Sequence, residues 1–503
     1  MQKSSIVIDK EYKIGDIDKR LFGSFVEHMG RCVYTGIYEP GHPEADENGF
    51  REDTSKLLKE LGTSIIRYPG GNFVSGYNWT DGIGPKAKRP VRLDLAWSAK
   101  EPNQVGIDEF ADWAERIGLP VMGAVNLGSG TPKDAGNILE YCNFPKGTYW
   151  SDLRIKNGYT KPHDIKIWCL GNEMDGPWQI CHMEAYEYGR KACETAKIMK
   201  WIDPSIELVS CGSSSPDLDT FPDWDRIVLE NTYENVDFIS LHRYYSENGK
   251  RGDYLTSFVD MDEFIKTVVA VADYVKGKLR SKKKMMLSFD EYNVSQSHKP
   301  AAKSERWTYA RPISEGYYSV LDALSFSGLL CTLINHADRV KVACLAQLVN
   351  VIAPISTQPG GGAIRQAIFY PFMYASRYAR GQAIKAIVNC HEIKTETRGD
   401  VDALQVAAAF DEEDGTLNIF MLNCDQKEDV NVKIDLRSFG ECEPEEQIIL
   451  EPENGDIYAF NSFEHPENIK PHSVLLNCGK NNMPEFEIHH LSWNVIRIKV
   501  KNN

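Results

Sequence analysis

Eight short apolar runs, each separated from the next by a longer amphipathic stretch, constrain the fold of this chain more than any other feature. The runs cover residues 21–26, 64–68, 120–126, 165–170, 207–211, 236–241, 284–289 and 341–345. The stretches with helical periodicity between them include residues 54–61, 106–117, 183–200 and 261–278. Near-continuous apolar strands alternating with helices are typical of a parallel sheet buried on both faces. Eight such units predict an α/β fold, the (β/α)8 barrel, with long loops.

The pattern changes after residue 380. From there to the C-terminus, short runs of alternating apolar and polar residues are separated by turn residues such as Asp414-Gly415. Such a pattern predicts an antiparallel β-sandwich. Residues 4–8 also have the composition of a strand and precede the first barrel unit. We therefore expect a catalytic barrel over residues 16–380 and a sandwich over residues 381–503, joined by an N-terminal strand within residues 1–15.

The charge of the chain excludes several classes of partner. The formal net charge of the 503 residues is -15, and an acidic surface repels the phosphates of nucleic acids and anionic membranes. No apolar segment is long enough to span a membrane, and the N-terminal apolar run, residues 6–8, is too short for a signal peptide. We therefore expect a cytoplasmic protein that binds neither nucleic acid nor membrane.

The cysteines and histidines indicate neither disulfides nor metal. None of the twelve cysteines forms a C-x-x-C pair, and cytosolic thiols stay reduced. The histidines do not have metal-ligand spacings such as H-E-x-x-H. We therefore expect free thiols and no bound metal.

Polar side chains follow most of the eight apolar runs. In a (β/α)8 barrel these positions meet at the C-terminal rim, where the active site lies. Carboxylates follow the first, fourth and seventh runs, and amide or phenol groups follow several others. These candidates are Glu27, Asn72, Asn172, Glu173, Tyr244, Glu291 and Gln347. Two carboxylates can cleave a glycosidic bond, while amides and phenols bind sugar hydroxyls. The rim therefore predicts a glycoside hydrolase.

Glu173 and Glu291 are the leading catalytic pair because they follow runs on different sides of the predicted barrel. A retaining mechanism needs two carboxyl groups about 5 to 5.5 Å apart. Asn172 precedes Glu173 and is a candidate ligand for the sugar 2-hydroxyl, a contact that strengthens in the transition state.

Three further polar residues have structural as well as functional interpretations. Arg67 either neutralises an inward-facing carboxylate or contacts substrate. His242 is expected to orient another side chain. Asp290 precedes Glu291 on the same strand and should point to the opposite side, which favours a supporting role.

Six segments of the chain closely resemble glycoside hydrolase family 51, and within it the α-L-arabinofuranosidases. They are FGSFVEHMGRCVYTGIYEP, IIRYPGGNFVSGYNW, WCLGNEMDGPWQ, ISLHRYY, LSFDEYNV and CLAQLVNVIAPI, in the order of the family. The resemblance covers nearly the whole chain. It implies a barrel with a jelly-roll sandwich, Glu173 as acid/base and Glu291 as nucleophile. It also implies arabinofuranose binding by the other five candidate residues, no cofactor, and an intracellular homo-oligomer, often a hexamer.

The resemblance breaks down just after Glu291. Many relatives carry aromatic residues there, whereas this chain has Ser295-Gln296, so the leaving-group side of the pocket is expected to be more open or more polar. Trp97 and Trp178 remain candidates for stacking against sugars.

We expect a retaining, exo-acting α-L-arabinofuranosidase that removes terminal units from arabinan, arabinoxylan or derived oligosaccharides. The alternatives are a xylosidase or an endo-glucanase on the same barrel. A sugar-binding protein with a dead site would have lost a carboxylate, and both are present.

Overall fold

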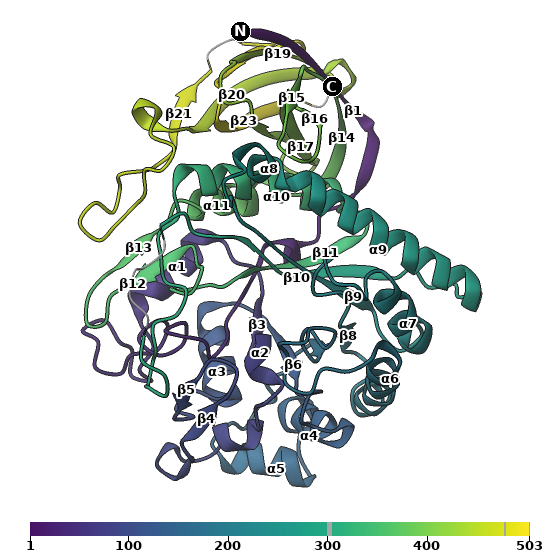
Figure 1. Cartoon of the computed structure of the whole chain (residues 1–503), viewed down its shortest axis with the longest axis vertical. Coiled ribbons are helices and arrows are strands. Elements are labelled where there is room, and N and C mark those ends of the chain that lie inside the picture. Colours follow the sequence, from purple (N-terminus) through teal and green to yellow (C-terminus); the bar gives the residue numbers. More distant parts are fainter. Residues whose placement is uncertain (299–303, 477–478, 502–503) are drawn as a thin grey trace.

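The computed structural model of the protein describes residues 1–298, 304–476 and 479–501, and consists of a barrel with a sheet domain above it (Figure 1). Eight parallel strands close the barrel in the order β10-β11-β2-β3-β6-β7-β8-β9. The strands are β2 (Gly23–Phe25), β3 (Ile66–Tyr68), β6 (Val121–Val125), β7 (Ile167–Leu170), β8 (Glu207–Ser210), β9 (Phe238–Tyr245), β10 (Met286–Val294) and β11 (Val340–Ala346). Each predicted run overlaps one of these strands, so the predicted (β/α)8 barrel is confirmed.

Helices surround the barrel. They are α1 (Glu52–Leu61), α2 (Gly71–Val74), α3 (Ile107–Ile117), α4 (Pro132–Asn143), α5 (Tyr149–Lys156), α6 (Ala185–Ile202), α7 (Asp223–Thr232), α8 (Arg251–Leu255), α9 (Ser257–Leu279), α10 (Val320–Asn335) and α11 (Phe369–Tyr378). Their ends follow local sequence signals. Thr131 and Asp134 form a reciprocal capping box at the start of α4, where Pro132 is the first helical residue. Gly62 ends α1 with a φ of 78°, a conformation that favours glycine.

The sheet domain contains nine strands in the order β21-β20-β23-β18-β17-β14-β1-β19-β22. They are β1 (Gln2–Asp16), β14 (Gln382–Asn389), β17 (Leu404–Asp411), β18 (Thr416–Asn423), β19 (Val430–Asp435), β20 (Glu441–Leu450), β21 (His472–Leu475), β22 (Glu485–Ile488) and β23 (Ser492–Lys501). Strands β20 and β22 lie near opposite ends of this order, yet Gln447 on β20 donates a hydrogen bond to the carbonyl of Glu487 on β22. The sheet therefore curls over on itself. It encloses its own apolar core, as a β-sandwich does.

Both chain termini contribute to this domain. Strand β1 pairs antiparallel with β14 and parallel with β19, and the N-terminus lies beside the sheet strands in Figure 1. We propose a domain boundary between α11 and β14, near residue 380.

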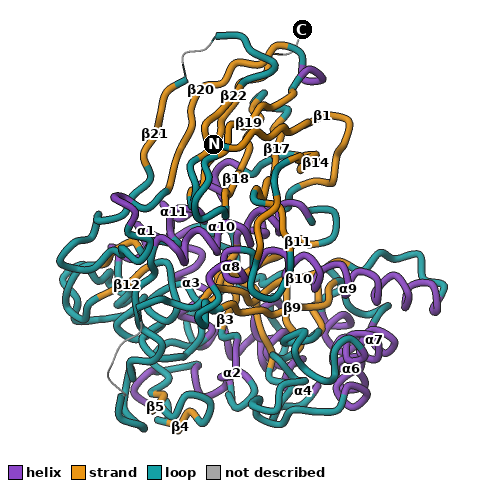
Figure 2. The backbone as a smooth tube through the Cα atoms, turned by 45° about the horizontal axis from the view of Figure 1, so that its top comes forward, coloured by secondary structure: helices purple, strands orange, loops and turns teal. Residues whose placement is uncertain are grey.

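Helix α10 lies between the barrel and the sheet domain (Figure 2). Every residue from Val320 to Ile334 is buried, and the helix contacts both β10 and the sheet strands β17 and β18. A helix that is apolar on all sides requires apolar partners all round. This helix therefore joins the cores of the two parts.

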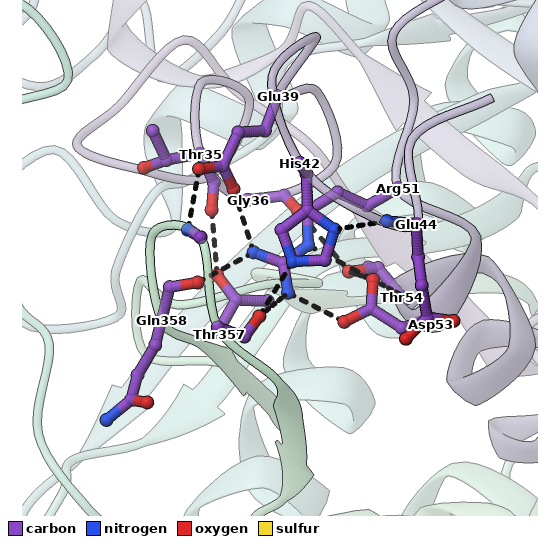
Figure 3. A network of polar contacts seen from close by, with 12 residues as sticks. Thr35, Gly36, Glu39, His42, Glu44, Arg51, Asp53, Thr54, Thr357 and Gln358 are labelled. Atoms are coloured by element: carbon purple, nitrogen blue, oxygen red, sulfur yellow. Dashed lines mark hydrogen bonds and ion pairs between the residues drawn. The ribbon is translucent and has the colours of Figure 1, made fainter. Parts of the chain in front are cut away.

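Three short two-stranded sheets lie in the loops of the described residues, and a buried arginine anchors one of them. The short strands are β4 (Arg92–Asp94), β5 (Ala99–Glu101), β12 (Ile355–Thr357), β13 (Ala363–Arg365), β15 (Glu392–Lys394) and β16 (Asp400–Asp402). Figure 3 shows Arg51, which is fully buried. Its guanidinium binds Glu39 and Asp53 and also donates to the carbonyls of Gln358 and Gly361. This network holds the tip of the β12–β13 hairpin against the loop that follows β2.

No helix within the described segments is both long and apolar enough to cross a membrane. Each of the eleven cysteines in those segments is a free thiol, as expected.

Candidate active site

A cavity of about 450 Å³ opens at the C-terminal ends of the barrel strands. Its lining combines carboxylates, amides, hydroxyls, aromatic rings and an arginine. The lining residues are Glu27, Met29, Asn72, Trp97, Glu173, Trp178, Ser214, Ser215, Asp217, Arg243, Tyr244, Glu291, Gln347 and Ile352. The structure therefore brings together Glu27, Asn72, Glu173, Tyr244, Glu291 and Gln347 from six different strand ends.

Glu173 and Glu291 face each other in this cavity. Glu173 follows β7 and Glu291 lies on β10. A carboxylate oxygen of each, together with a ring nitrogen of His242, lies within 4.8 Å of the other two. Both side chains are largely buried, with 8% of each residue exposed. This separation fits a retaining pair and is too short for an inverting pair, whose carboxyl groups are roughly 6.5 to 9.5 Å apart.

Each oxygen of Glu291 has its own hydrogen-bond donor. The Tyr244 hydroxyl donates to Oε1 at 2.6 Å, and Nη1 of Arg67 donates to Oε2 at 3.0 Å. Burial raises the pKa of Glu291, while the positive charges of His242 and Arg67 oppose that rise. The negative charge of the neighbouring Glu173 adds to this rise in the pKa of Glu291.

Glu173 is held by an indole and an imidazole. Trp178 Nε1 donates to Oε2 at 2.6 Å, and Nδ1 of His242 lies 3.0 Å from Oε1. The backbone of Glu173 has a φ of 44°, in the left-handed region. A residue other than glycine pays about 1–3 kcal/mol for such a conformation, and such outliers cluster at functional sites.

His242 connects the acid side of the pocket to Asp290. Its Nε2 atom lies 3.0 Å from Oδ1 of Asp290. Burial opposes the charge on the ring, but Glu291, Asp290 and Glu173 outweigh it and raise the pKa of His242 to about 10. Burial also opposes ionisation of Asp290, but the Arg67 charge and His242 lower its pKa. Neither His242 nor Asp290 belongs to the lining of the cavity within the described residues, which is the arrangement expected of residues that support the catalytic pair.

The spacing of Glu173, His242 and Glu291 also raises the question of a metal ion. A histidine binds metal through an unprotonated ring nitrogen. With a pKa of about 10, the ring carries protons on both nitrogens at neutral pH and donates them to carboxylates. Each ring nitrogen of His242 already lies 3.0 Å from a carboxylate oxygen, Nδ1 from Glu173 and Nε2 from Asp290, so the ring as placed offers neither nitrogen to a metal ion.

Glu27 forms the opposite wall of the pocket. Its Oε1 accepts hydrogen bonds from Trp97 Nε1 and from the backbone N–H of Phe73, both at 2.8 Å. Gln347 donates to its Oε2 at 3.3 Å. Burial raises the pKa of Glu27 well above its usual range, which favours the protonated form.

Gly71 makes this position of Glu27 possible. A Cβ atom at residue 71 would lie 2.2 Å from Cδ of Glu27, and the residue has a φ of +57°. Gly71 therefore clears space for a carboxylate of the pocket.

Asn172 and Arg67 lie below the cavity lining. Nη2 of Arg67 donates to Oδ1 of Asn172 at 2.6 Å, and Asn172 in turn donates to Oδ1 of Asn72 at 3.3 Å. Arg67 therefore contacts both Glu291 and Asn172, and it is buried, which agrees with the structural interpretation. Asn172 is also buried, beside the residues that face the cavity.

One side of the cavity contains residues that were not predicted from the sequence. Ser214, Ser215 and Asp217 follow the fifth apolar run, and Arg243 lies between two residues that were identified. The signal was the Gly-Ser-Ser-Ser segment directly after that run. Asn126, in contrast, follows the third run but lines a different cavity, where it donates to the carbonyl of Tyr77.

Ser295 and Gln296 lie outside the cavity lining within the described residues. Ser295 forms a hydrogen bond with Ser246, and Gln296 is buried and donates to the carbonyl of Gly316. Any effect of these two residues on the leaving-group side is therefore indirect.

A (β/α)8 barrel that places two buried carboxylates this close together in a rim pocket defines a glycoside hydrolase of the retaining type. Residues 57–266 match the family model of the α-L-arabinofuranosidase 1 domain, and residues 290–492 match that of the α-L-arabinofuranosidase C-terminal domain. The chain belongs to the α-L-arabinofuranosidases of glycoside hydrolase family 51.

Similar proteins span the full length of the chain. It is 54% identical to an intracellular exo-α-(1→5)-L-arabinofuranosidase 1 of Bacillus subtilis, over 99% of both chains. Its fold matches a family 51 α-L-arabinofuranosidase of Bifidobacterium longum with a TM-score of 0.94 and 43% identity over 99% of both chains. It also matches an α-L-arabinofuranosidase of Thermotoga maritima, solved with arabinose, with a TM-score of 0.87 and 32% identity over 99% of this chain and 100% of that one.

Proposed function

We propose that this protein is an exo-acting, retaining α-L-arabinofuranosidase with Glu291 as nucleophile and Glu173 as acid/base. The observation that carries the proposal is the separation of at most 4.8 Å between a carboxylate oxygen of Glu173 and one of Glu291. The family membership supplies the sugar, because the relative in Bacillus subtilis is named as an exo-α-(1→5)-L-arabinofuranosidase. The pocket supports the chemistry, because it surrounds the pair with hydrogen-bonding groups for a neutral sugar.

The reaction has two steps. In the first, Glu291 attacks the anomeric carbon while Glu173 transfers its proton to the departing glycosidic oxygen, forming a covalent arabinosyl ester. In the second, Glu173 removes a proton from water as the water attacks the anomeric carbon and Glu291 departs. Two inversions give net retention of the anomeric configuration. Tyr244 and Arg67 orient the attacking carboxylate through their hydrogen bonds to its two oxygens.

The arabinofuranose ring is bound by the wall opposite Glu173. We assign its hydroxyl contacts to Glu27, Asn72 and Gln347, which lie on neighbouring strand ends. Asn172 lies below them and donates one Nδ2 hydrogen to Asn72, and we assign its second Nδ2 hydrogen to the 2-hydroxyl. Gln347 supports this assignment because its Oε1 is buried and has no hydrogen-bond partner among the residues that the structure describes. A sugar hydroxyl would satisfy that acceptor.

The first test is hydrolysis of 4-nitrophenyl α-L-arabinofuranoside by the purified protein, with the β-D-xyloside and the α-L-arabinopyranoside in parallel. We expect the furanoside to be strongly preferred and Glu291→Ala to lose turnover. Azide should restore Glu173→Ala and yield the α-arabinosyl azide, because azide replaces water on the covalent intermediate. Preference for the xyloside, or a β-azide from Glu173→Ala, would contradict the assignment.

Substrate source, location and assembly are further proposals. The proposed substrates are arabinan, arabinoxylan and their oligosaccharides, from which the enzyme removes terminal arabinofuranosyl units. Comparing the rates at which arabinose is released from each of them shows which is preferred. The names of the relatives in Bacillus subtilis and Halalkalibacterium halodurans support a cytoplasmic location. We also propose that the protein forms a homo-oligomer, with a hexamer as the expected size. Light scattering of the purified protein tests this.

A further inference from the structure

The cavity has two chemically different sides, and the order of the barrel strands separates them. Glu27, Asn72 and Gln347 follow β2, β3 and β11, which are neighbours in the barrel. Ser215 and Asp217 follow β8, and Arg243 lies on β9. Because β7, which precedes Glu173, is the neighbour of β8, the acid/base lies next to the second side.

Arg243 contacts the other polar residues on this second side, and its guanidinium is held in place by hydrogen bonds. Nε and Nη2 bind the two carboxylate oxygens of Asp260 at 2.8 and 3.0 Å, which fixes the plane of the guanidinium. The remaining nitrogen, Nη1, donates to the Ser215 hydroxyl at 3.1 Å and binds Oδ2 of Asp217. The Arg243 side chain is only 13% exposed, whereas that of Asp217 is 75% exposed.

Asp217, which lines the cavity and is largely exposed, retains hydrogen-bonding capacity. Its Oδ1 atom accepts no hydrogen bond from the described residues, because the contacts of this carboxylate with Ser215 and Arg243 are made through Oδ2. The Ser215 hydroxyl and the guanidinium edge are the neighbouring polar groups. A carboxylate acceptor beside a hydroxyl and a cationic donor matches two adjacent hydroxyls of a sugar, one donating and one accepting.

We propose that Ser215, Asp217 and Arg243 bind the sugar that leaves in the first step, and that they select a hydroxylated leaving group. The proposal rests on the proposed function, because Glu173 must protonate the oxygen of the departing group and that group must lie on its side of the cavity. The sugar recognised here is neutral and carries at least two free hydroxyls. An alkyl or aryl leaving group would not contact these three residues in the same way.

The test compares leaving groups in Asp217→Asn and Ser215→Ala. The substrates are α-(1→5)-linked arabinobiose and methyl α-L-arabinofuranoside, which both have alkoxide leaving groups that need protonation by Glu173. A general loss of acid catalysis would therefore slow both. Loss of contacts to the leaving sugar slows only arabinobiose, so it lowers kcat/KM for arabinobiose relative to kcat/KM for the methyl furanoside. For Asp217→Asn we expect this ratio to fall about tenfold, which is typical of one hydrogen bond to a charged group.

Asp223→Asn is the matched control, because its side chain is also 75% exposed but lies on α7, outside the cavity lining. It should keep the wild-type ratio. An unchanged ratio in both Asp217→Asn and Ser215→Ala, with wild-type protein active on both furanosides, would overturn this inference and leave the proposed function intact. Wild-type protein inactive on both substrates would overturn the proposed function, and this inference with it.

Discussion

The hydroxyl of Tyr244 lies 2.6 Å from Oε1 of Glu291, on the oxygen that Arg67 does not bind. The carboxylate is thus held from two sides by donors on different barrel strands, β9 and β3. A carboxylate whose orientation is fixed before substrate arrives loses less entropy on reaching the attacking geometry.

Tyr244→Phe should lower kcat on 4-nitrophenyl α-L-arabinofuranoside by about 10- to 100-fold, because one hydrogen bond to a charged group is lost. The ring remains, so the thermal unfolding midpoint should change little. Tyr274→Phe, on an exposed tyrosine of α9, is the matched control and should behave as wild type. A kcat of Tyr244→Phe equal to that of wild type would show that the hydroxyl has no role in turnover.

Gly71→Ala should raise KM by displacing Glu27, since the new methyl group would lie 2.2 Å from its carboxyl carbon. Overpacking and the positive φ should together destabilise the fold by about 1–3 kcal/mol. The measurements are steady-state kinetics and denaturant unfolding. Gly84→Ala provides the control, because Gly84 also has a positive φ but the nearest atom to its new Cβ is 3.5 Å away. If both variants had the same KM, strain alone would explain the result for Gly71.

His242 should remain protonated at pH 8, because its neighbouring carboxylates raise its pKa to about 10. Since the pKa of a histidine in the unfolded chain is about 6.5, the stabilisation is complete below that pH and is lost as pH rises through about 10. Nitrogen chemical shifts of the ring test the charge directly, and the difference in unfolding free energy between wild type and His242→Gln should shrink between pH 7 and 9.5. A ring that titrates between pH 6 and 7 would contradict this prediction.

Asp225 should make the protein less stable as pH rises from 5 to 8. Burial raises the pKa of Asp225 to about 7, although its oxygens accept hydrogen bonds from the backbone N–H and the hydroxyl of Ser213. A raised folded-state pKa means that stabilisation is lost as pH rises through that value. Asp225→Asn resembles the protonated form, so its unfolding midpoint relative to wild type should be higher at pH 8 than at pH 5. Asp223→Asn, an exposed change on the same helix, should show no such trend; the same trend there would point to general charge effects.

The strands of the barrel were predictable because their apolar character is a local property of the sequence. The structure extends β9 and β10 beyond the predicted runs, to Tyr245 and Val294. Their last residues include His242 and Glu291, polar groups that interrupt the apolar pattern while the backbone continues in the ladder. Strand ends that carry a functional site are therefore the least visible to hydrophobic periodicity.

Six lining residues of the cavity were predictable because parallel strands of one barrel all end on the same side. Asn126 follows a strand in the same way, but its side chain donates a hydrogen bond to the carbonyl of Tyr77 and lies outside this cavity. Asp217 was not predictable, because it lies several residues beyond β8 in a loop without periodicity. Loop conformation depends on contacts from other parts of the chain, such as the bond between Arg243 and Asp217.

The sequence alone determined the barrel, the approximate positions of its eight strands and the carboxylates at their ends. Each of these depends on the order of apolar and polar residues along the chain, which is a local property. Only the tertiary structure decided the distance between Glu173 and Glu291, since it depends on how strands far apart in sequence close into a ring. The same holds for the charge on His242. Three carboxylates from two strand ends surround that ring, and electrostatic energies depend on separation in space rather than along the chain.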